Sequence, residues 1–194
     1  VVHRELRLAE RRGGSMYIVF TNPEHGGKDE LKQIYIENTD DGVYLGSGYY
    51  LSNISVSFSR EKIDGLVDFV EEARQFARES GKQKSLEVFN DPRGKFTRDE
   101  SYIFAYDYQG RTLALPYQPE LVGTIRIDAQ DPNGVDYVRQ IMNAAQDGSG
   151  FAYYIYPDPS QDMIPRLKLS YAVNVDDTWL LGSGIYSQDE EKTE

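Results

Sequence analysis

The sequence lacks cysteine and is poor in histidine. The absence of cysteine excludes disulfides and thiol catalysis within this chain. The two histidines, His3 and His25, both lie near its start, so residues 55–188 contain none. Histidine is the commonest general base and a member of the usual catalytic triad. We therefore expect no triad chemistry in that part of the chain.

Long apolar runs and an excess of positive charge are also missing. No run approaches the roughly 20 apolar residues of a membrane-spanning helix, and no signal peptide is visible. The anchors of a membrane-bound parent protein would therefore lie outside this chain. Lys and Arg number 21 against 32 Asp and Glu, which gives a net charge of −11. This balance argues against nucleic acid and against an anionic membrane surface as partners.

Apolar and aromatic residues, by contrast, are plentiful. Hydrophobic residues make up 39% of the chain and aromatic residues 12%. That content is enough for a packed core and argues against disorder. The fifteen tyrosines favour half-buried strands, in which the ring packs while the hydroxyl stays in water.

One hairpin-like stretch dominates the pattern. Residues 167–175 alternate, which predicts a strand with one buried face. Its apolar face carries Leu167, Leu169, Tyr171, Val173 and Val175, and the other face carries Lys168, Ser170, Ala172 and Asn174. Asp176-Asp177 supplies a turn. The second strand ends in Gly182-Ser183-Gly184, where missing side chains allow a bulge or a close approach of backbone.

The same stretch occurs twice. Residues 31–50 repeat residues 167–186 at a constant offset of 136. The offset holds upstream at three more pairs of identical residues, which are Gly14/Gly150, Tyr17/Tyr153 and Pro23/Pro159. Two copies of one unit are therefore expected. We divide the chain into residues 1–54, the C-terminal half of a first module, residues 55–188, a complete module, and residues 189–194, an acidic tail.

Periodicity predicts the remaining elements. Ser59 is a plausible N-cap for a long helix whose apolar residues recur at helical spacing from Ile63 to Ala77 and which ends at Ser80-Gly81. The other expected elements are a helix tail at 1–12, strands at 16–20, 31–39, 42–50, 102–108, 111–115 and 151–156, a short helix at 85–89, and a helix carrying Val135, Val138, Ile141, Met142 and Ala145.

These elements predict an α+β fold of the PAS-like kind. An antiparallel sheet of about five strands would carry the long N-terminal helix on one face. The loop from Tyr117 to Gly123 and the later helix would cover the opposite face and form a concave site.

No group of residues in the sequence has the spacing of a catalytic, phosphate-binding or calcium-binding site. Glu71 and Glu72 are adjacent, so they do not face each other on a helix. The Gly-Ser-Gly stretches sit at strand ends and not before a helix, so they lack the anion-binding N-terminus of a phosphate loop. Asp128, Asp131 and Asp136 lack calcium-loop spacing and are better explained as turn caps. We expect a protein that is not an enzyme and that holds no metal or cofactor.

Lys168 is the residue of greatest interest for binding. It lies in mid-strand on the face opposite Leu169 and Tyr171, and Ser170 shares its face. A lysine there could pair with a ligand carboxylate. The alternatives are an ion pair with a neighbouring acid or a side chain that reaches solvent. Its recurrence as Lys32 favours a structural role.

Aromatic residues would form the walls of this site. Phe104 and Tyr106 share one face of their strand with Tyr102, a stripe that more often packs a core than lines a ligand site. Tyr117 follows a proline in an irregular loop, where specificity groups tend to lie. The predicted ligand-binding residues for a small organic anion are Phe104, Tyr106, Tyr117, Tyr153, Lys168 and Ser170.

The order of several short motifs resembles the Cache domain, especially the single-Cache type 2 kind that also occurs in tandem. The segments that carry the resemblance are Leu66–Ala73, Phe89–Phe96, Tyr102–Asp107, Leu113–Gly123, Lys168–Tyr171 and Gly182–Tyr186. The resemblance covers about residues 55–188 in full and residues 1–52 as the last half of a second copy.

The resemblance implies an extracytoplasmic sensor domain of a membrane-anchored histidine kinase or chemoreceptor, with a small-molecule ligand. Many such sensors work as dimers, so a homodimer is a further expectation from the resemblance. The family often has a histidine directly before the first proline of the loop, and this chain has Leu115 there. A Lys or Asn is common directly after Gly123, and this chain has Thr124 there. These changes favour an alternative, a structural or interaction module without a ligand.

Overall fold

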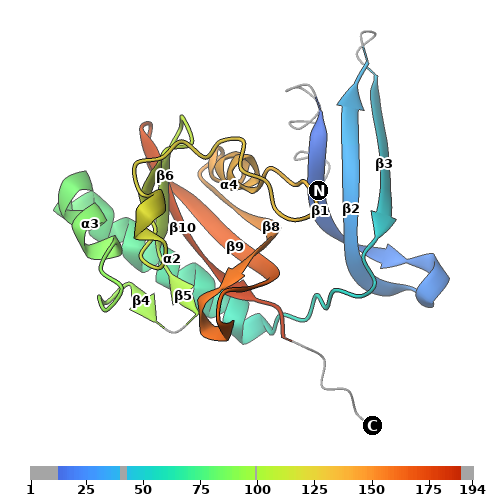
Figure 1. Ribbon diagram of the computed structural model, residues 1–194, viewed down its shortest axis with the longest axis horizontal. Coiled ribbons are helices and arrows are strands. Elements are labelled where there is room, and N and C mark those ends of the chain that lie inside the picture. The colour runs from blue at the N-terminus through green and yellow to red at the C-terminus, as the bar shows by residue number, and fades with distance from the viewer. Residues whose placement is uncertain (1–12, 40–42, 99, 189–194) are drawn as a thin grey trace.

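The computed structural model describes residues 13–39, 43–98 and 100–188. The predicted helix tail at residues 1–12 and the acidic tail at residues 189–194 lie outside these ranges. The described chain forms a five-stranded sheet in the order β7-β6-β10-β9-β8, a three-stranded sheet β1-β2-β3, and a short pair β4-β5 (Figure 1).

All neighbours in the five-stranded sheet are antiparallel. The strands of this sheet are β6 (Phe104–Asp107), β7 (Thr112–Ala114), β8 (Ser149–Asp158), β9 (Ile164–Asp176) and β10 (Trp179–Tyr186). The predicted α+β fold with a sheet of about five antiparallel strands is confirmed. The predicted strand at 102–108 is interrupted, because Ile103 separates β5 (Ser101–Tyr102) from β6, while β4 (Thr97–Arg98) pairs with β5.

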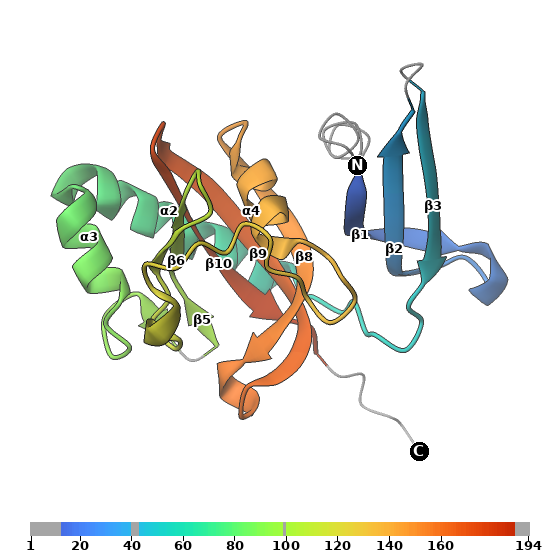
Figure 2. The same ribbon diagram turned by 45° about the horizontal axis from the view of Figure 1, so that its top comes forward.

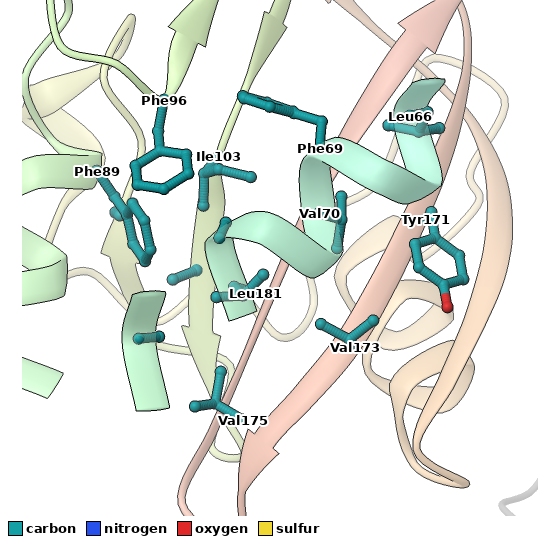
Figure 3. Close-up of a cluster of buried hydrophobic side chains, with 14 of the residues drawn as sticks. Leu66, Phe69, Val70, Phe89, Phe96, Ile103, Tyr171, Val173, Val175 and Leu181 are labelled. Carbon is teal, nitrogen blue, oxygen red and sulfur yellow. The ribbon is translucent and has the colours of Figure 1, made fainter. Parts of the chain in front are cut away.

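The long helix α2 (Arg60–Ser80) covers one face of this sheet, as predicted. Ser59 is its N-cap, and its side chain accepts a hydrogen bond from the Lys62 N–H at 3.2 Å. The apolar stripe packs against β9 and β10 (Figure 3). Gly81, with φ of 76°, separates α2 from α3 (Lys82–Phe89), which begins three residues before the predicted start.

A second layer covers the opposite face. It consists of α4 (Tyr137–Ala145) and the irregular chain that precedes it. The ring of Tyr137, at the start of α4, stacks on Tyr154 of β8 with centroids 5.2 Å apart. Both faces of the sheet are therefore buried, which explains why the burial of β9 and β10 is almost continuous and does not alternate.

The three-stranded sheet repeats the last three strands of the larger one. β1 (Gly14–Asn22), β2 (Lys28–Asn38) and β3 (Tyr44–Tyr50) correspond to β8, β9 and β10 at the offset of 136. The short 3-10 turns after β1 and β8 also correspond. Asn22 caps the first by accepting from the Glu24 N–H at 3.0 Å, and Asp158 caps the second by accepting from the Ser160 N–H at 2.9 Å.

The two sheets meet beside β8 and the chain that leads into α4 (Figure 2). Leu31 of β2 is buried against Val135 and Leu167. The side chain of Gln33 donates to the Asn133 carbonyl at 2.9 Å. Further along the same face of β2, beyond this contact, the side chain of Tyr35 is exposed. Among the described residues, no helix is long and apolar enough to cross a membrane.

Candidate functional site

Lys168 of β9 is fully buried on one face of the five-stranded sheet. It lies on β9 opposite Tyr154 of β8 and Tyr186 of β10, and its side chain points to the face that α4 covers. Its Nζ lies over four aromatic rings from four different strands. The distances from Nζ to the ring centroids are 4.2 Å for Tyr102, 4.9 Å for Tyr186, 5.5 Å for Tyr156 and 5.9 Å for Phe104. We call Lys168 and these four rings the lysine cage.

The ammonium of Lys168 donates a hydrogen bond to the Tyr102 hydroxyl at 3.0 Å. Burial lowers the pKa of Lys168 from 10.5 to about 7, and the negative charges of Asp158 and Glu100 oppose this change. Asp158 itself accepts a hydrogen bond from Arg166 at 3.0 Å. Within the described residues, no carboxylate lies at ion-pair distance from Lys168. Among the described residues, the structure therefore shows neither sequence-based alternative, an acidic partner or a side chain in solvent.

The rest of the cage face is packed to contact. Ser170, two residues along β9, is buried, and its Oγ hydrogen-bonds the Tyr154 hydroxyl at 2.7 Å. Gly184 of β10 faces both side chains. A Cβ at that position would lie 2.5 Å from Lys168 Cε and 2.5 Å from Ser170 Oγ. The expected close approach at Gly182-Ser183-Gly184 is thus what makes room for the lysine.

Three predicted wall residues lie on this face. Phe104 and Tyr106 of β6 are buried, with ring centroids 5.8 Å apart. Tyr117 packs edge-on against Tyr102 at 5.2 Å. With Lys168 and Ser170, the structure thus brings five of the six predicted site residues to one side of the sheet.

The placement of Tyr153 at the site was wrong. Tyr153 pairs with Leu169, whose side chain points to the α2 face, and its ring lies 6.1 Å from that of Phe58. Tyr154 occupies the position that we assigned to Tyr153. Because side chains alternate along a strand, an error of one residue transfers a side chain to the opposite face.

Several cage residues were not predicted as site residues. These are Tyr102, which shares a face with Phe104, together with Tyr156 and Tyr186; Tyr154, next to the cage, was not predicted either. The alternation of side chains along a strand could have identified them. Lys168 lies opposite Tyr154 and Tyr186, so these side chains share its face of the sheet, and Tyr156, two residues after Tyr154, lies on that face as well.

The first repeat contains part of the same arrangement. Lys32 Nζ lies 4.8 Å from the Tyr50 ring centroid and 5.5 Å from that of Phe20. These rings correspond to Tyr186 and Tyr156 at the offset of 136. Lys32 is only partly buried and Phe20 is exposed. A lysine between aromatic residues of its two neighbouring strands is therefore common to both repeats, whereas full enclosure occurs only in the second.

The buried bond between Tyr154 and Ser170 offers a test of this packing. Replacing Tyr154 with Phe leaves the Ser170 hydroxyl without its partner, and we expect unfolding to become easier by about 1–2 kcal/mol. Urea unfolding of this variant measures the change. The double variant Tyr154→Phe/Ser170→Ala removes both partners and should lose clearly less than the sum of the single variants. Additive losses would contradict a direct bond.

Solved structures that share this arrangement include parts of chemotaxis proteins. A methyl-accepting chemotaxis protein from Vibrio parahaemolyticus shares 28% identity with this chain at a TM-score of 0.56, covering 65% of this chain and 88% of that one. A Cache chemosensory domain described for carboxylic acid recognition shares the fold, with 23% identity, a TM-score of 0.55, and coverage of 66% and 95%.

The chain belongs to the Cache domain family. The sequence model of this family, dCache_2, matches residues 1–191. Among curated relatives, the sensor histidine kinase MctS of Rhizobium johnstonii is 33% identical over 91 residues, which is 46% of this chain and 20% of the kinase. The chain thus spans a small part of that relative. The sequence-based resemblance is confirmed, and the protein is a Cache sensor domain of the kind found in histidine kinases and chemoreceptors.

Proposed function

We propose that this protein is the extracytoplasmic sensing part of a membrane-bound transducer, and that it binds a small organic carboxylate at the lysine cage. The observation that carries the proposal is Lys168, a wholly buried lysine without an ion-pair partner among the described residues. The Cache family membership supports the sensing role and the location.

The energetics of the cage favour an anionic ligand. An ammonium buried without a counter-ion is costly, and ring faces return only about 0.5–2 kcal/mol each. Lys168 has three N–H groups, and one of them meets Tyr102. A bound carboxylate would accept the remaining donors and supply the missing charge. In an enclosed apolar site this attraction is stronger than in water. The solved Cache domain described for carboxylic acid recognition gives the ligand class further support.

A titration tests the proposal directly. Isothermal titration of the chain against short carboxylates, amines and amino acids should give heat for a carboxylate, together with a thermal shift. The absence of both signals for every compound would refute sensing by this domain.

The affinity for that carboxylate should depend on pH. The free domain holds Lys168 with a pKa of about 7. A bound carboxylate stabilises the ammonium and raises this pKa, so binding takes up a proton above pH 7. We expect the dissociation constant to change little between pH 6 and 7 and to rise by up to about tenfold per pH unit above that. Titrations in buffers of different ionisation enthalpy would detect the proton uptake. Equal affinities at pH 6.5 and 9 would contradict this role of Lys168.

A ligand-free structural module is the second candidate. Leu115, which replaces the histidine common in the family, is buried in the aromatic layer, and its N–H donates to the Asn90 side chain at 3.0 Å. Side chains could fill the whole interior on this view. A domain whose melting temperature no carboxylate changes, and whose interior beside Lys168 is dry and closed in a crystal, would favour it.

We also infer that residues 1–54 are the C-terminal half of a first Cache-like unit and residues 55–188 a complete one. The correspondence of β1, β2 and β3 with β8, β9 and β10 supports this division, as do the shared lysine and its aromatic neighbours.

A further inference from the structure

A second group of buried polar atoms lies on the same side of the sheet as the lysine cage. It consists of Arg126, in the chain before α4, and Tyr137, the first residue of α4. Arg126 Nη1 and Tyr137 Oη are both buried and have no partner at full hydrogen-bond geometry within the described structure. The side chains of Arg126, Tyr137 and Tyr156 nevertheless lie close enough to interact, and the positive charge of Arg126 opposes the rise that burial causes in the pKa of Tyr137. The guanidinium carbon lies 5.6 Å from the Tyr137 ring centroid.

Tyr156 connects this group to the cage. Its ring centroid lies 5.5 Å from Lys168 Nζ and 5.4 Å from the ring of Tyr137. Burial raises the pKa of the Tyr156 phenol, and the positive charge of nearby Arg126 opposes that rise. Lys168 and Arg126 therefore both border Tyr156, one at its ring and the other near its hydroxyl.

Arg126 is partly buried, and among the described residues no carboxylate lies within ion-pair distance of it. Its backbone N–H donates to the Gly110 carbonyl at 2.8 Å, which fixes this part of the chain. The acidic side chain two residues further on, Asp128, accepts from Arg139 instead. A buried guanidinium N–H and a buried phenol without partners are costly to leave unmet. The planar guanidinium fork matches a carboxylate in a bidentate arrangement.

We propose that Arg126 and Tyr137 form a second anionic subsite, so that the domain selects dicarboxylates, with one carboxylate at Lys168 and the other at Arg126. The proposal rests on the carboxylate-binding function proposed above for Lys168. A dicarboxylate lying along Tyr156 would meet a cation at each end, whereas a monocarboxylate leaves Arg126 and Tyr137 unsatisfied.

Succinate and propionate are suitable probes, because they differ mainly in the second carboxylate. We expect isothermal titration at pH 6.5 to give at least tenfold tighter binding of succinate by the wild-type chain. Arg126→Met should weaken succinate binding about 10- to 100-fold and change propionate binding less than threefold, because it removes a charged hydrogen bond that only succinate makes. Arg126→Lys, which keeps the charge without the fork, should recover part of the loss.

Two controls separate this subsite from general damage. Arg139→Met removes an exposed arginine paired with Asp128 and should leave both affinities unchanged. Tyr137→Phe removes only the hydroxyl and keeps the buried ring, so we expect it to fold and to weaken the binding of succinate alone. Equal losses for both acids in Arg126→Met, or tighter binding of propionate by the wild type, would overturn the subsite while leaving the lysine site intact. Failure of both acids to bind the wild type would overturn both proposals.

Discussion

Replacing Lys168 with methionine should stabilise the fold by about 2–4 kcal/mol at pH 7 and at the same time remove most of the affinity for a carboxylate. Methionine has a similar length and fills the same space without a charge. The loss of one charged hydrogen bond to the ligand corresponds to about 1.5–3 kcal/mol of binding free energy. A variant that is more stable and less active is the signature of a residue retained for function.

The stability gain follows from the lowered pKa of Lys168. Its ordinary value of 10.5 and its folded value of about 7 differ by about 3.5, and at about 1.4 kcal/mol per pKa unit burial costs about 5 kcal/mol. Below pH 7 both states carry the proton and the full cost is present. Between pH 7 and 10.5 the unfolded chain binds a proton that the folded chain lacks, so stability rises with pH. The aromatic rings return part of the cost, which makes the expected gain smaller.

Urea unfolding at pH 6.5 and 9 checks the predicted stability and its pH dependence, and isothermal titration of the variant with a carboxylate that the wild type binds checks the loss of affinity. The wild type should become more stable between these values relative to Lys168→Met, because the variant lacks this titration. Lys32→Met is the matched control at the equivalent position of the first repeat. Lys32 is only partly buried between Phe20 and Tyr50, so its loss should cost about 0.5–1 kcal/mol and have the opposite sign. A Lys168→Met variant less stable than the wild type would show that the lysine supports the fold.

The regular elements of this protein were predictable because they repeat or alternate. The offset of 136 identified the strand pairs β2-β3 and β9-β10, and the apolar stripe beginning near Ile63 identified α2. The face of Lys168 also followed from alternation, since Leu169 and Tyr171 pack under α2. These predictions needed only local periodicity, which residues of a strand or helix display directly.

The depth and the neighbours of Lys168 were not predictable in the same way. The alternation of side chains along a strand predicts the face to which a side chain points. It does not predict how many other strands enclose that side chain. The aromatic rings of the cage come from β6, β8 and β10, whose order in the five-stranded sheet differs from their order in the chain, and from β5, which belongs to the separate pair β4-β5. The choice of Tyr153 over Tyr154 shows how a register uncertain by one residue changes the site. Arg126 stands in an irregular segment that has no period to read.

Asp131 is a case in which the sequence predicted one role and the structure adds another. We expected it to cap a turn, and its Oδ1 accepts from the N–H groups of Asn133 at 2.9 Å and Val135 at 3.0 Å. Its Oδ2 also accepts from the Ile155 N–H of β8 at 3.0 Å. The charge of Asp131 adds to burial in raising the pKa of Tyr17 on β1. One buried carboxylate therefore joins the chain before α4 to β8 at the meeting point of the two sheets.

Replacing Asp131 with alanine should therefore destabilise the protein by about 3–4 kcal/mol, because three backbone N–H groups lose a charged acceptor at once. Asp131→Asn keeps one acceptor oxygen, but its amide NH₂ group replaces the other oxygen and faces a backbone N–H that needs an acceptor. We therefore expect about half the loss of Asp131→Ala. Asp136→Ala, which removes only an exposed bond from Gln130, should cost less than 1 kcal/mol. Urea unfolding ranks the three variants. If Asp131→Ala were no worse than Asp136→Ala, the contact with β8 would contribute nothing to holding α4 over the lysine cage.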